Sequence, residues 1–587
     1  MQKKSIRLQS CRKQYTHDQD KFCSPEQTVT RFKERLKETG LDILKEVKRI
    51  DTGRLDIPVY FSVCGEEASA VIGNKKQMGK GSTPEQSQAS ACMELAERYS
   101  FFSFIRNDDN FLVGDYAEMI SMGYPVLDQK ILLASVHDHS LTPEVFDRLL
   151  HGLPMQWTWA TRLSDNASVL IPFSWFYAIN EFNGPSAGNT FEEAVLQGVS
   201  ELIERHVCAL VSRDKLATPA IDQNSIQEPV ARELIQKFRS QGIELYLNDF
   251  TLDTGIPTVA ALAWDPKTFP DKSEIVYTAG TTPDPNKALI RALTEVAQLA
   301  GDFETGSNYV ASGLPKPLSL DEVEHVVHPD KTTTVEEMVC LADDDMFVEI
   351  QQYLQAVRKM GSDIYLINTM HPLLQIPAIY TIIPGAHFRE RAMGGSASLF
   401  AAKLATQLLE GSILEDKLKD MQNYIKDSYY LAFYRGKFAY EQGDCSLALD
   451  LFTQSLALSP NQEDIPYIYS YLGCCQRDLE QFDLAIENIQ QGLSYDEERP
   501  DMHNILGVCY FKTDQYEKAV QHFRRAVVLN PVSAIDHANL ALNLEKTGQL
   551  EEAIEEYQVA LGLDPHIAFA LERLETLLMN RAERGEA

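Results

Sequence analysis

The sequence predicts an α+β domain followed by an all-α repeat solenoid. Through residue 383, short β-branched and aromatic runs alternate with helix-forming stretches, and a glycine-led turn precedes three of these stretches. From about residue 430 the strand signals stop, and small residues recur every 34 positions. We therefore expect four segments: a flexible N-terminal arm over 1–20, a mixed domain over 21–412, a linker helix region over 413–428 and a repeat array over 429–587.

The mixed domain is expected to contain strand pairs backed by helices. Its β-branched and aromatic runs are typical of strands, and the three glycine-led phrases fit a three-fold use of one strand-turn-helix unit. The clearest expected strands cover residues 57–63, 169–173, 258–264, 364–367 and 379–383.

Two of the glycine-led phrases have identical spacing. Gly81-Ser82-Thr83 precedes Glu94-Leu95-Ala96-Glu97-Arg98, and Gly188-Asn189-Thr190 precedes Glu201-Leu202-Ile203-Glu204-Arg205, in both cases with thirteen positions from glycine to glutamate. Carboxylates at i and i+3 share one face of a helix, so two such helices would place four carboxylates in one cleft. Hard oxygen ligands suit Mg²⁺, and arginine binds phosphate as a bidentate partner. The pattern predicts a Mg–nucleotide site; a solvated helix face is the alternative.

A third, looser phrase runs from Gly280-Thr281-Thr282 to Arg291 and Glu295. Together the three phrases resemble the signatures of the YcaO family over about residues 20–400. The matching residues are Ser90, Glu94, Glu97 and Arg98 in the first phrase; Ser186 to Asn189, Glu193, Glu201, Glu204 and Arg205 in the second; Arg291 and Glu295 in the third; and Lys21 with Thr28 near the N-terminus.

The resemblance implies that ATP is bound through Mg²⁺ ions held by glutamates. The residues that it places near metal or phosphate are Glu94, Glu97, Glu193, Glu201, Glu204 and Glu295. The residues that it places on the nucleotide are Lys21, Thr28, Ser90, Arg98, Asn189, Arg205 and Arg291. No residue is assigned a catalytic role.

Family members use ATP to phosphorylate the oxygen of a peptide backbone amide. Attack by a Cys, Ser or Thr side chain gives an azoline ring, and external sulfide gives a thioamide, with ADP and phosphate as co-products. This chain departs from the family in two places: His206 stands where aspartate is usual, and its end, Gly585-Glu586-Ala587, lacks the proline-rich tail of many azoline-forming members. Ring formation is therefore less expected. The alternative function is an ATP-binding accessory factor for methylthiolation of a ribosomal protein, which makes no bond itself.

Two histidines outside these phrases follow expected strands. His371 precedes a proline and His387 lies in a proline- and glycine-containing turn, where functional groups often occur. Both are candidate acid–base groups, and a hydrogen-bonded loop role is the alternative.

The C-terminal array has the tetratricopeptide (TPR) pattern, in which small residues mark helix crossings and a proline follows the second helix. Four repeats and a capping helix over 568–579 are expected to stack into a solenoid with a concave groove. The recurring positions are Gly436, Ala448 and Ser455; Gly473, Ala485 and Gly492; Gly507, Ala519 and Ala526; and Ala541, Ala553 and Ala560.

Composition restricts the partners. The net charge of −31 argues against nucleic acid, and no run of residues is apolar enough for a membrane span. Ten scattered cysteines without a Cys-x-x-Cys pair suggest reduced thiols in the cytoplasm. The expected partners are a peptide or protein substrate and a protein bound in the TPR groove. Self-association into a homodimer is left open, and the sequence does not name the peptide.

Overall fold

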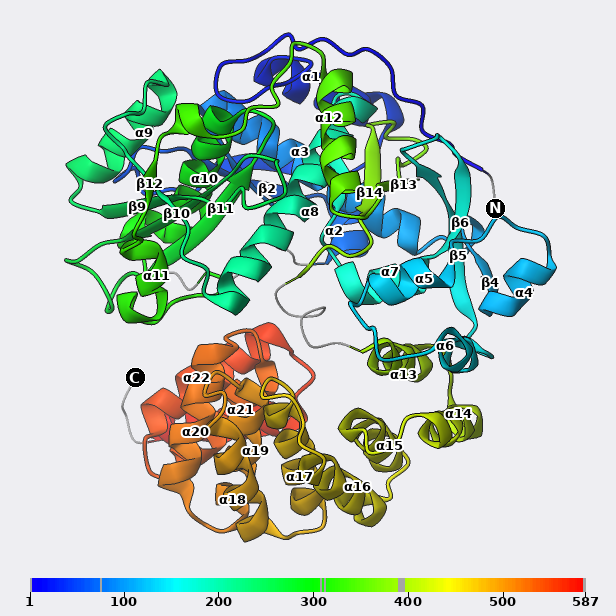
Figure 1. The fold of residues 1–587 in the computed structure, drawn as a ribbon. Coiled ribbons are helices and arrows are strands. Elements are labelled where there is room, and N and C mark those ends of the chain that lie inside the picture. The colour runs from blue at the N-terminus through cyan, green and yellow to red at the C-terminus, as the bar shows by residue number, and fades with distance from the viewer. Residues whose placement is uncertain (1–2, 74–76, 307–308, 311–312, 389–395, 584–587) are drawn as a thin grey trace. The chain divides into compact units, whose positions relative to one another are not determined.

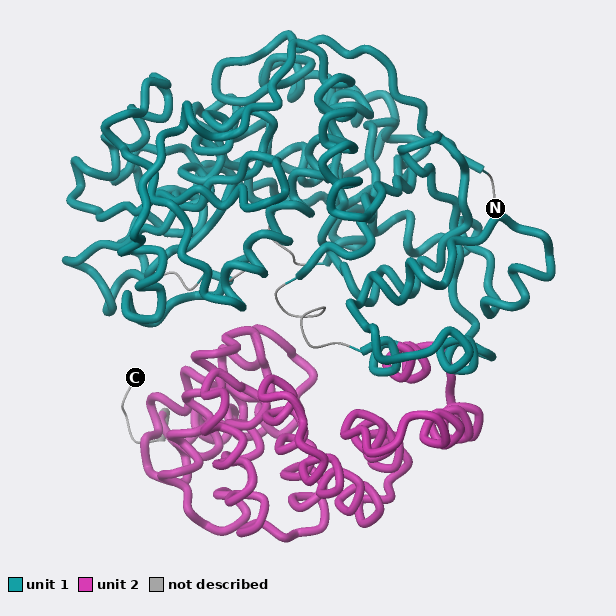
Figure 2. Tube along the Cα trace, viewed as in Figure 1, with its two compact units in different colours: residues 1–400 teal, residues 401–587 magenta. Residues whose placement is uncertain are grey.

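The computed structural model describes residues 3–73, 77–306, 309–310, 313–388 and 396–583 (Figure 1). The chain divides into two compact units, residues 1–400 and 401–587 (Figure 2). This division falls inside helix α13 (Ala397–Leu408), ahead of the expected boundary at 412/413. A mixed unit followed by a helical unit confirms the predicted fold class.

The described strands of unit 1 form three sheets. Strand pairs within them are antiparallel except for β12 with β8. The first sheet is formed by β1 (Leu44–Arg49), β2 (Val59–Cys64) and β3 (Gln77–Lys80). The second is formed by β8 (Ala220–Ile221), β9 (Glu244–Asp249), β10 (Thr258–Trp264), β11 (Val276–Thr281) and β12 (Thr332–Thr333). The third is formed by β4 (Leu112–Gly114), β5 (Met155–Arg162), β6 (Ser168–Pro172), β7 (Pro185–Ala187), β13 (Tyr365–Asn368) and β14 (Ala378–Ile382).

The five clearest strand predictions correspond to β2, β6, β10, β13 and β14. Helices cover the sheets, and the large buried side chains include Trp157, Trp175 and Tyr380. The helices of unit 1 before α13 are α1 (Pro25–Thr39), α2 (Glu66–Ile72), α3 (Pro84–Ile105), α4 (Tyr116–Ser121), α5 (Gln129–Ala134), α6 (Pro143–Leu150), α7 (Phe173–Asn180), α8 (Phe191–Asp214), α9 (Pro229–Ser240), α10 (Pro285–Ala300), α11 (Glu324–Val327) and α12 (Met346–Lys359).

The three phrases form three strand-turn-helix units: β3 to α3, β7 to α8, and β11 to α10. The side chains of Thr83, Thr190 and Asp284 cap the three helices by accepting hydrogen bonds from backbone N–H groups of the first turn. Because these caps are equivalent, they serve as a common reference from which the residues of the three strand-turn-helix units can be aligned one by one.

A small residue on each strand lies against its own helix. A Cβ on Gly280 would stand 2.5 Å from the Ala288 carbonyl oxygen and 2.6 Å from the Ala292 nitrogen, eight and twelve residues later. Gly79 has the same two neighbours at the same offsets in the first unit. In the second unit Ser186 takes this place and donates to the Ala194 carbonyl oxygen at 2.8 Å. This close approach fixes how far each helix is rotated relative to its strand.

The contacts between strand and helix also show how the third, looser phrase aligns with the other two. Counted from the strand residues in contact with the helices, the equivalent of Gly81 and Gly188 is Thr282, and Gly280 corresponds to Gly79. Glu94, Glu201 and Glu295 then occupy the same position in the three units. The third phrase is therefore an equal copy in backbone terms, although its glycine stands elsewhere.

The N-terminal segment, for which the sequence predicts a flexible arm, lies along the domain. The Gln9 N–H donates to Glu192 Oε1 at the start of α8 at 2.9 Å. Ser82, in the turn before α3, donates to Asp18 from its N–H at 3.2 Å and from its hydroxyl at 2.6 Å. The segment thus contacts the first two strand-turn-helix units.

Two lysines fix the same segment, Lys287 from α10 and Lys13 from the segment itself. Lys287, in the first turn of α10, donates from Nζ to the Thr16 carbonyl oxygen at 2.7 Å. Lys13 Nζ forms a buried ion pair with Glu349 of α12 at 2.6 Å. Residues 9–18 therefore connect all three units and lead into Lys21.

Unit 2 is a stack of helix pairs, as the TPR pattern predicts. After α14 (Gly411–Tyr424), small residues allow close crossings: a Cβ on Gly507 would lie 2.7 Å from the Phe523 ring. The helices are α15 (Tyr429–Glu441), α16 (Cys445–Ala457), α17 (Ile465–Asp478), α18 (Phe482–Leu493), α19 (Pro500–Lys512), α20 (Tyr516–Leu529), α21 (Ala534–Lys546), α22 (Leu550–Leu563) and α23 (Ala568–Glu583).

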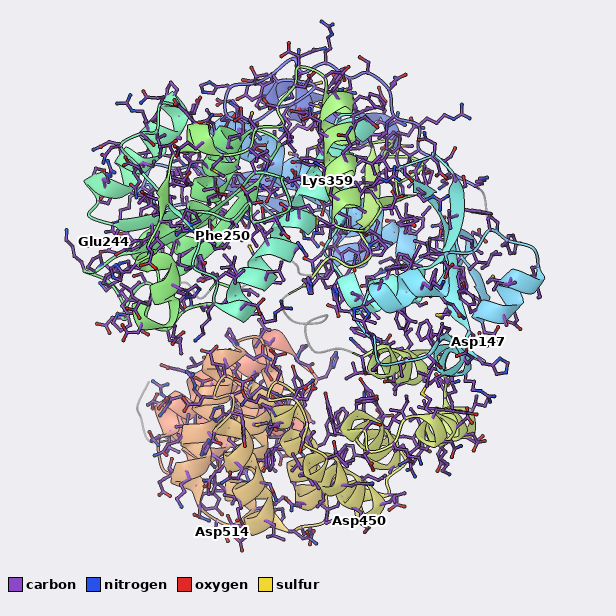
Figure 3. All side chains as sticks on the ribbon, viewed as in Figure 1. Asp147, Glu244, Phe250, Lys359, Asp450 and Asp514 are labelled. Atoms are coloured by element: carbon purple, nitrogen blue, oxygen red, sulfur yellow. The ribbon has the colours of Figure 1, made fainter. Side chains whose placement is uncertain are left out.

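Many charged side chains lie on the surface and many apolar ones in the core, as expected for a chain rich in acidic residues. Asp450 and Asp514, labelled in Figure 3, are exposed on unit 2, whereas Phe250 is buried in unit 1. Across the described ranges, the helices are too short or too polar to cross a bilayer.

We predict that Gly280→Ala destabilises unit 1, because the added methyl meets rigid helix backbone and overpacking costs about 1–3 kcal/mol. The measurement is urea unfolding followed by tryptophan fluorescence, since all four tryptophans lie in residues 157–264. Gly562→Ala in α22 is the control: nothing stands within 4 Å of its added Cβ. An unchanged midpoint for Gly280→Ala would show that the strand and helix are not in tight contact.

Candidate functional site

The three strand-turn-helix units surround a cavity of about 300 Å³. Its walls come from the helix faces of α1, α3, α8 and α10, from the ends of β3 and β7, and from the N-terminal segment before α1. All thirteen residues that the sequence predicts for the site line this cavity: Lys21, Thr28, Ser90, Glu94, Glu97, Arg98, Asn189, Glu193, Glu201, Glu204, Arg205, Arg291 and Glu295.

Equivalent positions of the helices supply the acidic groups. Glu94, Glu201 and Glu295 form one layer, with one carboxylate from each unit. One turn further on, Glu97 and Glu204 form a second layer, and the third unit has Gln298 there. The cavity is therefore strongly acidic on two helices and less so on the third.

Arginines on the same helices balance part of this charge. Arg98 lies 3.7 Å from Glu94 and 3.5 Å from Glu97, measured between nitrogen and oxygen. On α8, Arg205 repeats the arrangement with Glu201 at 3.6 Å and Glu204 at 3.5 Å. These separations are longer than a charge-assisted hydrogen bond of about 2.8 Å, so the ion pairs are loose.

The third unit contributes a further cation. Arg291 Nε lies 3.7 Å from Glu204 Oε2, and its Nη1 donates to Gln197 Oε1 at 2.8 Å. Glu204 Oε2 is buried and has no hydrogen bond among the described residues. The site thus holds a buried carboxylate oxygen that is ready to accept a ligand.

Burial makes the carboxylates costly to keep charged. Loss of solvent raises the pKa of Glu94, and the neighbouring Glu201 charge raises it further, against Arg98 and Lys80. The pKa of Glu97 is raised well above its usual value, again mainly by burial. Negative charge in this cavity therefore exceeds what the arginines compensate.

The N-terminal residues close one end of the site around Glu193. Lys21 Nζ is 3.6 Å from Glu193 Oε1, and the Phe22 N–H donates to Oε2 at 3.1 Å. The Asn189 amide donates to the Thr28 hydroxyl at 3.1 Å and lies 3.3 Å from Glu193. This cluster joins α1 to the turn before α8.

Sequence reasoning missed several residues of the wall. The most prominent is Lys80, which ends β3 directly before Gly81 and whose ammonium contacts the Glu295 carboxylate. Burial lowers its pKa to about 7. Its place beside the first glycine turn was a signal that pointed to it. The other missed polar residues are Gln19, Cys23, Gln86, Gln197 and Gln298.

The residues fit Mg²⁺ and a nucleotide. An excess of buried carboxylate, loose ion pairs and a buried carboxylate oxygen without a hydrogen bond are the conditions that divalent cations relieve. In the described ranges, no three His, Cys, Asp or Glu side chains already converge around one point that could hold an ion. The individual ligand assignments therefore stay predictions.

The histidine candidates lie outside the cavity wall. The His387 N–H donates to His206 Nδ1 at 3.0 Å, and its ring stacks on His137 with centroids 3.7 Å apart. Burial lowers the pKa of His206 to about 4 and of His387 to about 3. His371 accepts a hydrogen bond from the Leu374 N–H. These rings are neutral at physiological pH, and their packing favours the loop role.

Comparison with known families identifies both parts of the chain. The family described as YcaO cyclodehydratase, ATP- and Mg²⁺-binding, matches residues 78–387, and tetratricopeptide repeats match 500–531 and 537–567. The chain belongs to the YcaO family and carries C-terminal TPR repeats. Its cofactors are ATP and Mg²⁺, as the sequence predicts.

Individual relatives are distant. An uncharacterized protein of Methanothermobacter thermautotrophicus is 26% identical over 383 residues, covering 62% of this chain and 93% of that protein. The ribosomal protein S12 methylthiotransferase accessory factor YcaO of Escherichia coli is 27% identical over 309 residues, covering 47% and 48%. A solved heterocyclase in complex with substrate and cofactor has a TM-score of 0.52 at 24% identity, covering 66% and 55%. The last comparison shows the shared fold.

We predict that Glu97→Gln stabilises the metal-free protein. The amide of glutamine keeps the shape of the side chain and cannot ionise, whereas burial raises the pKa of the Glu97 carboxyl. Each pKa unit of this shift corresponds to on the order of 1 kcal/mol of unfolding free energy. Thermal unfolding in EDTA at neutral pH, read by tryptophan fluorescence, should show a higher midpoint.

The control is Glu337→Gln, since hydrogen bonds with Thr334 lower the pKa of Glu337 and favour its charged form. Its midpoint should not rise. A lower midpoint for Glu97→Gln would mean that the pairing with Arg98 outweighs burial.

Proposed function

We propose that the chain is an ATP- and Mg²⁺-dependent enzyme that activates a backbone amide of a peptide or protein for ring closure or thioamide formation. The observation that carries this proposal is the single cavity that all thirteen predicted residues line. Six carboxylates and five cations meet there, most of them on helices whose rotation is fixed by close strand contacts. A site that only displayed charge to solvent would not need buried glutamates.

The chemistry suits such a site because an amide oxygen is a poor leaving group until it is phosphorylated. When bound, Mg–ATP supplies the phosphoryl group and neutralises charge that develops on it. The protein contributes by positioning. Glu94, Glu97, Glu201, Glu204 and Glu295 would hold the metal, while Arg98, Arg205 and Arg291 would bind the phosphates.

The N-terminal cluster closes the cavity around the nucleotide. Lys21, Thr28 and Asn189 are joined through Glu193, so they can be ordered together when the nucleotide is present. Closure excludes water from the reacting phosphoryl group, which would otherwise be lost to hydrolysis.

The TPR unit holds the protein or peptide partner. Stacked helix pairs present an extended concave surface that suits a peptide, and residues 416–587 hold 29 Asp and Glu against 15 Lys and Arg. The protein works in the cytoplasm, which agrees with ten free cysteines.

The second candidate is an ATP-binding accessory factor that makes no bond itself. It is favoured by the Escherichia coli relative, whose name describes an accessory factor of ribosomal protein S12 methylthiotransferase. In that function the same cavity binds ATP, and its occupancy regulates a partner that the TPR unit holds.

We expect calorimetry to show Mg²⁺-dependent ATP binding in the micromolar range that is usual for such ligands. EDTA should abolish it, as should the double substitution Glu94→Ala/Glu201→Ala, which removes one layer of carboxylates. Glu144→Ala, at a fully exposed glutamate of α6, is the control. If the double variant bound ATP with the affinity of the wild type, the nucleotide site would have to lie elsewhere in the protein.

The two functions can be distinguished by incubating candidate peptides with the protein and ATP and then measuring the peptide masses by mass spectrometry. Loss of one water indicates ring closure, and replacement of oxygen by sulfur in the presence of sulfide indicates thioamide formation. ATP binding without any peptide-dependent turnover or mass change would favour the accessory function.

A further inference from the structure

Lys80 stands where the three-fold arrangement of the site is broken. It is the last residue of β3, and the equivalent residues at the ends of β7 and β11 are Ala187 and Thr281. One of the three strand ends thus carries a cation, and the other two carry short neutral side chains. The lysine does not belong to the repeated pattern and needs its own explanation.

The ammonium reaches from the first unit to the third. Lys80 Nζ pairs with Glu295 of α10, and its side chain is 16% exposed. Glu94 and Glu204 attract it, while Arg291 and Arg205 repel it. The lysine is therefore inside the carboxylate cluster, among groups from all three helices, and it faces two arginines that would suit an anion between them.

The Lys80 ammonium, with a single positive charge, lies within a cluster of carboxylates that is suited to divalent cations. If Mg²⁺ binds the Glu295 carboxylate, the lysine loses its main partner and is repelled by the metal as well as by Arg291. Its flexible four-carbon stem then lets the ammonium turn to the nearest anion. If the glutamates held Mg²⁺ with ATP here, the terminal phosphoryl group would supply that anion.

We propose that Lys80 binds the terminal phosphoryl group of ATP, and that it pairs with Glu295 when the nucleotide is absent. The inference rests on the proposed function. Lys21, Thr28 and Asn189 form a separate cluster around Glu193, so they would contact other parts of the nucleotide. Lys80 then distinguishes ATP from ADP, which lacks its partner.

The test compares binding of a non-hydrolysable ATP analogue and of ADP, each with Mg²⁺, by calorimetry. Lys80→Met should weaken the analogue by about 10- to 100-fold, the range for a hydrogen bond to a charged group. ADP affinity should change less than three-fold, because its phosphates do not reach Lys80. Lys80→Arg, which keeps the charge, should retain most of the preference for the analogue.

Equal weakening of both ligands, or no weakening of either, would overturn the inference and leave Lys80 as a structural partner of Glu295. Lys45→Met, at an exposed lysine of β1, is the matched control and should bind both ligands normally. If Lys80→Met is unfolded by tryptophan fluorescence, Lys80→Gln replaces it. Failure of the wild-type protein to bind either nucleotide would instead overturn the proposed function, and the inference with it.

Discussion

The structure depends on a balance between close backbone packing and electrostatic repulsion at one cavity. Gly79, Ser186 and Gly280 allow each helix to lie directly against its strand, and this contact sets the direction in which the glutamates point. The same rotation directs like charges toward one another, so the fold gains packing and loses electrostatic free energy at the same place. Loose arginine pairs at 3.5–3.7 Å offset only part of that loss.

From this balance we expect binding and stability to be coupled in the YcaO unit. A domain that encloses excess negative charge is less stable alone than with a cation, and the free energy released on binding includes relief of that repulsion. Function is thus supported by an unfavourable feature of the metal-free fold. Native proteins commonly accept such a cost at a site when the rest of the core is well packed, and unit 1 has a large aromatic core around Trp157, Trp175 and Tyr380.

The sequence predicted the parts of the fold that depend on local pattern. Alternating apolar runs gave β10 with its exact bounds of Thr258–Trp264, and the 34-residue period gave the paired helices of unit 2. Six of the thirteen cavity residues were found because Glu-x-x-Glu-Arg repeats at fixed spacing, and the other seven came from the resemblance to the YcaO family. Gln197 and Gln298 were missed because their residue types differ from those at the equivalent positions, Ser90 for Gln197 and Glu97 and Glu204 for Gln298, and Lys80 was missed because its two counterparts are uncharged. The third phrase was read as a looser version because its glycine stands two positions earlier, and contact with the helix shows that Gly280 corresponds to Gly79.

The contacts of the N-terminal segment affect the order in which unit 1 can fold during synthesis. Lys13 pairs with Glu349, and the Cys11 N–H donates to Asp345, so partners more than 330 positions apart must meet. The contacts of this segment with the Ser82 turn, α8 and α10 can form earlier in translation, but its buried ion pair with Glu349 has to wait until α12 has emerged. Fixing the segment that connects the three strand-turn-helix units is therefore completed late in the formation of unit 1.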